Sequence, residues 1–330
     1  MTVIDFANPP GILVLKGLPA SGKTTLARQW VARDTRNRLR VNYADLEHDL
    51  FGDVKLSKVE RDAAALEGLT RAEHWLMGDL KARSIVVDNL NLTPSQQAPW
   101  IDLARRLGTT IDLHEMEANL VECVRHDRYR GIGRVGEAVI CRWALISGRI
   151  DWTDYKQPFL IVDVDGTLAD TSHRQHFLTM PEDEHVCKDI QLDGAGVCPK
   201  CLKVKPKAST WKKDWPGFFA ACKDDAPIQN VIDIITELAM SYHIMIVSGR
   251  PSDLCGIDTE EQLRKWKLPY EFLFMRNGGD GRTDVEVKSE ILSFLPRNRI
   301  RGVFDDRPSV LRMYQDSGLT TFALGLLKEF

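Results

Sequence analysis

The sequence lacks any long hydrophobic run, and no apolar segment approaches the roughly 20 residues that a membrane-spanning helix requires. Its first residues, MTVIDFANPPGILVLKG, also lack the basic start, the long apolar stretch and the small-residue cleavage site of a signal peptide. The sequence therefore predicts a cytoplasmic protein.

A strong net charge is also absent. The 44 lysines and arginines nearly balance the 47 aspartates and glutamates, which leaves a formal net charge of −3. The surface as a whole therefore has no general attraction for a polyanion, and a nucleic-acid partner would have to be held by local basic patches. The seven cysteines are an odd number, and three of them fall between residues 187 and 201, which favours reduced thiols or a bound metal over a secreted disulfide framework.

The length of 330 residues and the hydrophobic content of 43% suit two compact cores. Short apolar runs alternate with helical patterns, which predicts an α/β protein with two doubly wound parallel sheets, each covered by helices on both faces. The predicted strands lie within residues 12–17, 84–89, 109–116, 158–166, 243–249, 270–275 and 300–306. A polar, proline-containing segment at 151–158 separates the halves, so we expect domains at residues 1–153 and 154–330.

The segment GLPASGKT at residues 17–24 is a complete G-x-x-x-x-G-K-[ST] motif between a predicted strand and a helical pattern. Its glycines let successive backbone N–H groups face an anion, while Lys23 reaches the outer phosphates and Thr24 helps to hold magnesium. A chance glycine-rich turn is the alternative. The motif predicts an ATP site formed by Gly17, Ser21, Gly22, Lys23, Thr24 and Thr25.

Two further features follow this predicted phosphate site in the chain. Asp88 ends a buried strand, where parallel sheets place ligand-binding groups, and we expect it to contact the metal or the acceptor; capping of the next turn is the alternative. The segment VRHDRYRGIGRVG places arginines between glycines, which is typical of a mobile lid, although a solvated helix has the same composition. These arginines are Arg125, Arg128, Arg130 and Arg134.

The second half opens with a strand that ends in DVDGT at residues 163–167, which resembles the signature of haloacid-dehalogenase phosphatases. That chemistry requires two carboxylates placed two residues apart at the end of a strand. Asp163 is the expected nucleophile, which forms an aspartyl phosphate, and Asp165 is the expected acid and base.

Three later elements resemble the rest of that superfamily's site and occur in its order. We expect Ser248 in IVSGR to hydrogen-bond the phosphoryl group and Lys288 in DVEVKSEIL to neutralise it. Asp305 and Asp306 in VFDDR are expected to complete a magnesium site with Asp163 and Asp165. Each element is weak alone, since S-G-R is usually a turn and D-D usually a solvated loop, but together they predict a phosphatase site.

The order of the two halves resembles the bacteriophage-type bifunctional polynucleotide kinase/phosphatase family over nearly the whole chain. The segments that carry the likeness are GLPASGKTT, DNLNLTP, CVRHDRYRG, DVDGTLAD, VSGRPSD, GDGRTDVEVKSEIL and VFDDRPSVLRMYQDSGL. The resemblance implies a P-loop kinase fold followed by a haloacid-dehalogenase-like fold with a small cap insert. It also implies that Arg250 and Asp284 belong to the phosphatase site and that Arg130 is the lid arginine that faces ATP.

The family's activity is the healing of nucleic-acid ends. The resemblance implies magnesium-dependent transfer of the ATP γ-phosphate to 5′-hydroxyl ends of RNA or DNA, hydrolysis of 3′-phosphates, a ligase acting downstream, and the host-cell cytoplasm as the location if the chain is viral. One alternative is a small-molecule kinase fused to a metabolite phosphatase. Another is an active phosphatase whose kinase half only docks a nucleic-acid end, transfers poorly or serves another acceptor.

The chain departs from the family after the second strand, where the family places an N-R-D-D-x-R run. Direct alignment puts Ala44 at the position of the general base and Glu47 at the position of an arginine that contacts the scissile phosphate. Asp45 and His48 would restore the spacing if the strand were shifted by one residue, because such a shift reverses which side chains face the site. We therefore predict Asp45 as the base.

The insert at residues 181–214 is absent from the bacteriophage enzyme. It contains an H-x-C pair and a C-x-x-C pair, which favours a structural zinc over reduced cysteines in a loop. The four predicted ligands are His185, Cys187, Cys198 and Cys201. Lysines alternate with Trp211 and Trp215 on its flank, a pattern that suits a single strand but also a solvated loop; these are Lys203, Lys205, Lys207, Lys212 and Lys213.

Overall fold

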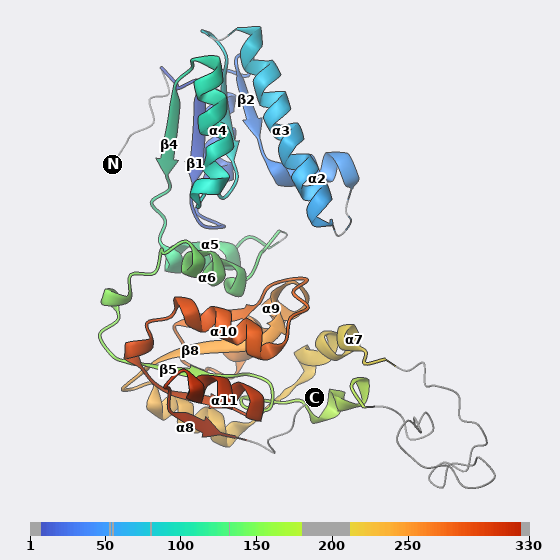
Figure 1. Ribbon diagram of the computed structural model, residues 1–330, viewed down its shortest axis with the longest axis vertical. Coiled ribbons are helices and arrows are strands. Elements are labelled where there is room, and N and C mark those ends of the chain that lie inside the picture. Colours follow the sequence, from blue (N-terminus) through green and yellow to red (C-terminus); the bar gives the residue numbers. More distant parts are fainter. Residues whose placement is uncertain are drawn as a thin grey trace, which may run out of the picture. The chain divides into compact units, whose positions relative to one another are not determined.

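A computed structural model of the chain describes residues 8–52, 54, 56–79, 81–131, 133–179 and 212–324. The chain forms two compact units. The first comprises residues 1–135 and 143–150, and the second comprises residues 136–142 and 151–330. Each unit is built on a parallel sheet of its own, so the predicted α/β class with two doubly wound sheets is confirmed (Figure 1). None of the helices described in these ranges is long and apolar enough to span a membrane.

The sheet of the first unit is wholly parallel and has the strand order β2-β3-β1-β4. Its strands are β1 (Ile12–Lys16), β2 (Arg38–Val41), β3 (Ser84–Asp88) and β4 (Ile111–Glu115). Because β1 pairs with β3 on one side and with β4 on the other, the strand order reverses at β1. Ligands bind at such a reversal, beyond the carboxyl ends of the strands.

Side chains alternate across this sheet and form a core on each face. Ile12 and Val14 pack with Trp100, which belongs to the helices on one side of the sheet. Leu13 packs on the opposite face with Trp30. The helices of the first face are α3 (Lys58–Gly78) and α4 (Pro94–Leu107), and Trp30 belongs to α1 (Lys23–Ala32) (Figure 1). The chain also forms α2 (Tyr43–Phe51), α5 (Leu120–Arg128) and α6 (Glu137–Ile146).

The sheet of the second unit is also parallel, in the order β11-β10-β5-β8-β9. Its strands are β5 (Phe159–Val162), β8 (His243–Pro251), β9 (Phe272–Arg276), β10 (Ile300–Asp305) and β11 (Thr321–Ala323). A separate antiparallel pair joins β6 (Ala169–Asp170) to β7 (Ala226–Pro227). Since β5 lies between β10 and β8, the residues at the carboxyl ends of these three strands are neighbours.

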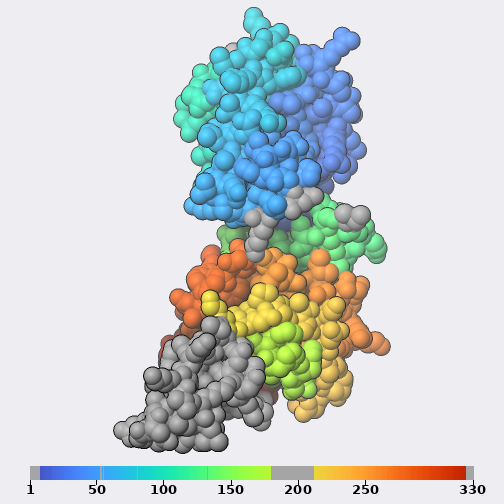
Figure 2. All heavy atoms as spheres, turned by 90° about the vertical axis from the view of Figure 1, so that its right-hand side faces the viewer, coloured from blue at the N-terminus to red at the C-terminus, as the bar shows by residue number. Residues whose placement is uncertain are grey.

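Helices cover both faces of the second sheet. Leu160 and Val162 of β5 pack with Ile232 and Ile235 on one face. These isoleucines belong to α8 (Gln229–Leu238), while α10 (Asp284–Phe294) and α11 (Pro308–Asp316) lie together on the other face (Figure 1). The other elements are α7 (Trp215–Ala220), α9 (Ser252–Lys265), η1 (Trp152–Asp154), η2 (Ser172–Phe177), η4 (Ala221–Asp224) and η5 (Arg297–Arg299). Figure 2 shows η2 and α7 side by side on the surface of this unit, where the Asp214 amide donates to the Phe177 carbonyl at 2.9 Å.

All seven strands predicted from apolar runs are present. The runs did not reveal β2 and β11, which are edge strands of their sheets. Polar and apolar residues alternate in the sequence RLRV of β2, and β11 has only three residues, so neither strand contains an apolar run. The β6 and β7 strands were also missed, because two residues are too short for a periodic pattern.

Candidate active sites

The phosphate loop connects β1 to α1 and requires glycine at two positions. Gly22 precedes α1 with a φ of 93°, in the left-handed region. A Cβ on Gly17 would lie 2.6 Å from Ser21 Oγ, so a side chain at this position would force the loop apart. The loop therefore turns tightly into the N-terminus of α1, where backbone N–H groups stabilise an anion.

Lys23 is the first residue of α1, and its ammonium group lies inside the loop with 7% of the residue exposed. Nζ donates to the carbonyl oxygens of Gly17 at 2.9 Å and Leu18 at 2.7 Å. Burial lowers the pKa of Lys23 to about 8, although the charge of Asp88 acts in the opposite direction. Nucleotide phosphates would give this buried cation a stronger partner than two carbonyls.

Asp88 lies at the carboxyl end of β3, next to the loop. It is 2% exposed, and its Oδ1 accepts a hydrogen bond from the Thr24 hydroxyl at 3.3 Å. The pairing of β1 with β3 brings these residues together, although 64 positions separate them in the sequence. A hydroxyl and a carboxylate at this point form the oxygen-rich set that magnesium takes beside a phosphate loop.

Asp45 lies in the first turn of α2, which Asn42 caps by accepting from the Asp45 amide at 3.0 Å. We expected a one-residue shift of a strand to position Asp45. Residues 43–51 instead form a helix, and the start of that helix positions Asp45. The Asp45 carboxylate does not point into the core: its side chain is 57% exposed and forms an ion pair with Arg40 at 2.5 Å. Ala44 is exposed and Glu47 is half-buried.

The lid segment is held by one buried carboxylate. Asp127 of α5 is 1% exposed and lies 4.0 Å from Arg130 Nη1 and 3.8 Å from Arg134 Nε. Its Oδ1 also accepts a hydrogen bond from the Val135 amide at 3.1 Å, which links the end of α5 to the residue that follows the lid arginines. Burial is the main cause of the lowered pKa of Lys23, and the positive charge of Arg130 adds to it. Arg125, Arg128 and Arg130 are exposed, as is Thr25 of the loop.

In the second unit, Asp163 follows β5 and forms a buried cluster with residues from α10 and β10. The ammonium group of Lys288 donates to Asp163 Oδ1 at 2.6 Å and to Asp305 Oδ2 at 2.7 Å. Each of the three residues is at most 4% exposed. The predicted nucleophile therefore faces the predicted phosphate-neutralising lysine directly.

Asp163, Asp305 and Asp306 each offer one carboxylate oxygen within 4.8 Å of the others, and this geometry suits a divalent cation. Asp306 Oδ1 is buried and accepts no hydrogen bond. Burial and the negative charge of Asp305 raise the pKa of Asp306 to about 7, and burial also raises the pKa of Asp163 above its usual range. Such crowding of carboxylates is relieved by a bound cation. A Cβ on Gly166 would lie 2.0 Å from Asp306 Oδ2, which explains the glycine of DVDGT.

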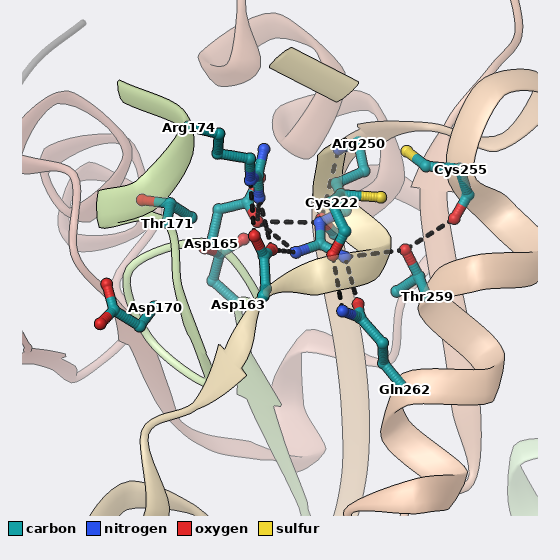
Figure 3. A network of polar contacts seen from close by, with 12 residues as sticks. Asp163, Asp165, Asp170, Thr171, Arg174, Cys222, Arg250, Cys255, Thr259 and Gln262 are labelled. Atoms are coloured by element: carbon teal, nitrogen blue, oxygen red, sulfur yellow. Dashed lines mark hydrogen bonds and ion pairs between the residues drawn. The ribbon is translucent and has the colours of Figure 1, made fainter. Parts of the chain in front are cut away.

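Asp165, the predicted acid and base, lies between two buried guanidinium groups (Figure 3). Its Oδ1 accepts from Arg174 Nη2 at 2.7 Å and from Arg250 Nε at 2.8 Å. Burial raises the pKa of Asp165, but the charges of Arg250 and Arg174 outweigh that effect and lower it to about 2. Asp225 accepts from both arginines and thereby holds them beside Asp165.

Arg250 was predicted to bind the phosphate or the substrate, and the structure places its guanidinium beside Asp165. Nε and Nη2 contact Asp165, and Nη2 also contacts Asp225. Nη1 donates to Thr259 Oγ1 at 3.0 Å and Gln262 Oε1 at 2.9 Å (Figure 3). These hydrogen bonds hold the guanidinium group beside Asp165, so Arg250 orients this carboxylate.

Asp284 and Lys288 lie four residues apart on α10, and so project from the same face of the helix. Asp284 accepts from Arg276 Nη2 at 2.6 Å and pairs with Arg307 Nη1 at 2.8 Å. It also packs on the S-G-R turn, since a Cβ on Gly249 would lie 1.9 Å from Asp284 Oδ1.

The Ser248 hydroxyl lies at the same turn and accepts from the Arg250 amide at 3.2 Å. It is 1% exposed. The structure thus collects the predicted residues of the second half around the carboxyl ends of β5, β8 and β10. Arg174 and Asp225 also belong to this group of residues, and they were not predicted from the sequence.

The four predicted zinc ligands, Trp211 and the lysines up to Lys207 lie outside the described residues. On the described flank, Lys212 and Lys213 are exposed, and the Lys213 ammonium lies 5.7 Å from the ring centroid of Trp215.

Both halves match known domain families. Residues 216–325 match the polynucleotide kinase PNKP phosphatase domain, and residues 12–142 match an AAA domain family. A curated relative from Schizosaccharomyces pombe (strain 972 / ATCC 24843), a bifunctional polynucleotide phosphatase/kinase, is 31% identical over 116 residues. That match covers 35% of this chain and 23% of the relative, so the chain spans about a quarter of the length of the curated relative it matches.

Two solved structures give weaker likenesses. A chain from the Pnkp1/Rnl/Hen1 complex is 20% identical, with 97% of this chain and 98% of that chain covered and a TM-score of 0.37. A haloacid dehalogenase-like hydrolase from Streptococcus pneumoniae is 13% identical, with 51% of this chain and 84% of that chain covered and a TM-score of 0.33. The first half thus matches an AAA domain family and the second half a polynucleotide kinase phosphatase-domain family.

Proposed function

We propose that this chain, which joins an AAA-family kinase domain to a phosphatase domain of the polynucleotide kinase family, heals both termini of a nucleic-acid break. Residues 1–153 would phosphorylate 5′-hydroxyl ends with ATP. Residues 154–330 would remove 3′-phosphates. The products, a 5′-phosphate and a 3′-hydroxyl, are the termini that a ligase joins, so a ligase is the partner expected to act next.

The observation that carries the proposal is the geometry around Asp163. An Asp163 oxygen attacks phosphorus, and the bond from phosphorus to the 3′-oxygen breaks as that oxygen takes a proton from Asp165. Asp165 then takes a proton from water, whose oxygen attacks the phosphoryl group and releases phosphate from Asp163. Lys288 neutralises charge on the phosphoryl oxygens throughout. A magnesium ion held by Asp163, Asp305 and Asp306 would supply further charge neutralisation.

The Asp165 environment suits a residue that changes role during the reaction. Its two arginine partners keep the carboxyl ionised in the free protein, which is the form that activates water. A bound phosphate brings negative charge, which raises the pKa of a neighbouring carboxyl and favours the protonated form that the first step requires.

In the kinase half, the 5′-hydroxyl oxygen attacks the γ-phosphorus of ATP, and ADP leaves as the bond to the β-phosphate oxygen breaks. Lys23 and Arg130 stabilise the charge that develops on the transferring group. Thr24 and Asp88 would hold magnesium, and Asp45 accepts the proton from the hydroxyl. Asp45 is suited to this role because it is exposed and linked through Arg40 to Asp88.

The experiment compares acceptors. The protein is assayed with labelled ATP and a 5′-hydroxyl oligonucleotide, and in parallel with a panel of nucleosides and sugars. Label in the oligonucleotide supports the proposal, and label only in a small molecule shows a metabolite kinase instead. Lys23→Ala should abolish transfer while hydrolysis of a 3′-phosphate continues; transfer that persists in Lys23→Ala contradicts the assignment of the loop.

We also propose that the 181–214 insert binds a structural zinc through His185, Cys187, Cys198 and Cys201. The exposed Lys212 and Lys213 beside Trp215 support strand binding at its flank. Changing Trp211 together with both lysines should weaken removal of 3′-phosphate from oligonucleotides more than from a small chromogenic phosphate. Equal losses on the two substrates would exclude strand binding, and metal analysis of the purified protein tests the zinc.

A further inference from the structure

Arg40 contacts two carboxylates beside the phosphate loop, and none of the motifs includes it. It lies on the edge strand β2, and its side chain is 16% exposed. Nε and Nη2 contact Asp88 Oδ2 at 2.8 Å and 2.7 Å, while Nη1 contacts Asp45 Oδ2 at 2.5 Å. The Arg40 guanidinium group thus links Asp88, which contacts Thr24, to Asp45, the predicted base.

The backbone around Asp45 is fixed to the same strand end. The Asn42 side chain donates to the Asp88 carbonyl at 2.5 Å, and Asn89 Oδ1 accepts from the Tyr43 amide at 2.9 Å. These contacts hold the start of α2 against β3, but they leave the Asp45 side chain free to rotate. A single exposed ion pair contributes little to stability. A planar guanidinium group that contacts two carboxylates, however, fixes the orientation of both.

The proposed phosphoryl transfer requires the Asp45 carboxylate to be held in a fixed position. A general base must stay within hydrogen-bond reach of the hydroxyl it deprotonates, and a small misplacement costs much of the rate. The contacts run from Thr24 to Asp88, from Asp88 to Arg40 and from Arg40 to Asp45, so the carboxylate is tied in three steps to the residue that follows Lys23.

We propose that Arg40 is a positioning residue of the kinase reaction, which holds the Asp45 carboxylate at the acceptor side of the phosphate loop. The proposal rests on the kinase function proposed above. In this proposal Arg40 acts through Asp45. A lysine at this position would keep the charge but lose the fork that reaches two carboxylates at once.

The test is a double-mutant cycle on the full-length protein, with ATP and a 5′-hydroxyl oligonucleotide as substrates. Arg40→Gln should lower kcat by about 10²-fold, within the range of a misplaced general base, and should leave the KM for ATP within about twofold. In an Asp45→Asn background the same change should cost less than about threefold, because the group that Arg40 positions is already gone. Arg40→Lys should recover part of the kcat.

Two results would overturn the proposal. Full additivity of the Arg40→Gln and Asp45→Asn losses would show that the two residues act separately. A rise in the KM for ATP as large as the fall in kcat would place Arg40 in the metal and nucleotide site through Asp88. The 3′-phosphatase rate of each preparation shows that the chain is folded, and Arg40→Lys keeps a cation beside the buried Asp88. A wild-type protein that labels no oligonucleotide would refute the proposed function itself, which is a separate outcome.

Discussion

Lys288 Nζ lies 2.6 Å from Asp163 Oδ1, and this buried contact joins α10 to the end of β5 across 125 residues of sequence. The same ammonium group contacts Asp305 at 2.7 Å. One lysine therefore lies in a cluster with three buried carboxylates, those of Asp163, Asp305 and Asp306, which leaves an excess of negative charge when all three are ionised. The excess makes the site a strong candidate for a divalent cation and disfavours a free phosphate until that cation is bound.

The first prediction concerns this cation. Chelation of divalent metal should stop release of 3′-phosphate, and added magnesium should restore it. Asp306→Asn should raise the magnesium concentration needed for half-maximal rate by about tenfold or more, because it removes a charged ligand that has no protein partner on Oδ1. The measurement is phosphatase rate against magnesium concentration, and a wild-type rate that survives chelation would contradict it.

The second prediction concerns Arg174, which is fully buried beside Asp165. Arg174→Lys should lower the phosphatase kcat by about 10²-fold, since a lysine cannot contact Asp165 and both oxygens of Asp225 together. Arg301→Lys is the matched control, because Arg301 is exposed and lies on β10 in the same unit as Arg174. Phosphatase kinetics and thermal unfolding of both variants are compared. Undiminished turnover in Arg174→Lys would show that Arg250 alone suffices.

A third prediction uses two glycines. The methyl group of Gly249→Ala would meet Asp284 Oδ1 at 1.9 Å, so it should displace Asp284 from the S-G-R turn. We expect the phosphatase rate to fall by about 10²-fold, as for a displacement of roughly 1 Å at a reacting centre. Gly281→Ala is the control, because a Cβ there meets nothing within 4 Å. If both variants lose activity equally, the loss does not come from Asp284.

The fourth prediction concerns the lid. Asp127→Ala removes the buried carboxylate near Arg130 and Arg134 and leaves the Val135 amide without its acceptor. The KM for ATP in the kinase assay should rise by about tenfold, which corresponds to the loss of one hydrogen bond to a charged group. Asp102→Ala, which removes an exposed ion pair with Arg105, should leave that KM unchanged. An unaltered KM in Asp127→Ala would show that the lid does not contact the nucleotide.

The sequence predicted those parts of the fold whose physical signal is local. Seven strands were recognisable because each contains a run of apolar residues, as strands buried on both faces of a parallel sheet do. The strands β2 and β11 lack that signal, because β2 reads RLRV and β11 has only three residues. DVDGT, S-G-R, the Asp284 and Lys288 pair and the Asp305 and Asp306 pair were found because each is a short local motif that lies in, or next to, a strand or helix.

The residues that escaped prediction owe their roles to tertiary contacts. Arg174 lies in the polar segment TSHRQHF and Asp225 in the polar segment KDDAP, yet both residues are buried against Asp165 or its partners. Arg40 escaped for the same reason, because a charged residue in a short edge strand normally faces water. Asp45 was chosen by spacing along an assumed strand, whereas the helix cap at Asn42 is what places it.

The most direct test of the account is the Asp163→Asn variant, assayed on both termini of a nucleic acid. One preparation is given a 3′-phosphorylated oligonucleotide, and ATP with a 5′-hydroxyl oligonucleotide. We expect release of 3′-phosphate to fall by about 10³-fold or more, because the amide cannot form the aspartyl phosphate, and we expect kinase turnover to stay within about twofold of the wild type. Release of 3′-phosphate at the normal rate by Asp163→Asn would contradict the assignment of Asp163 as the nucleophile.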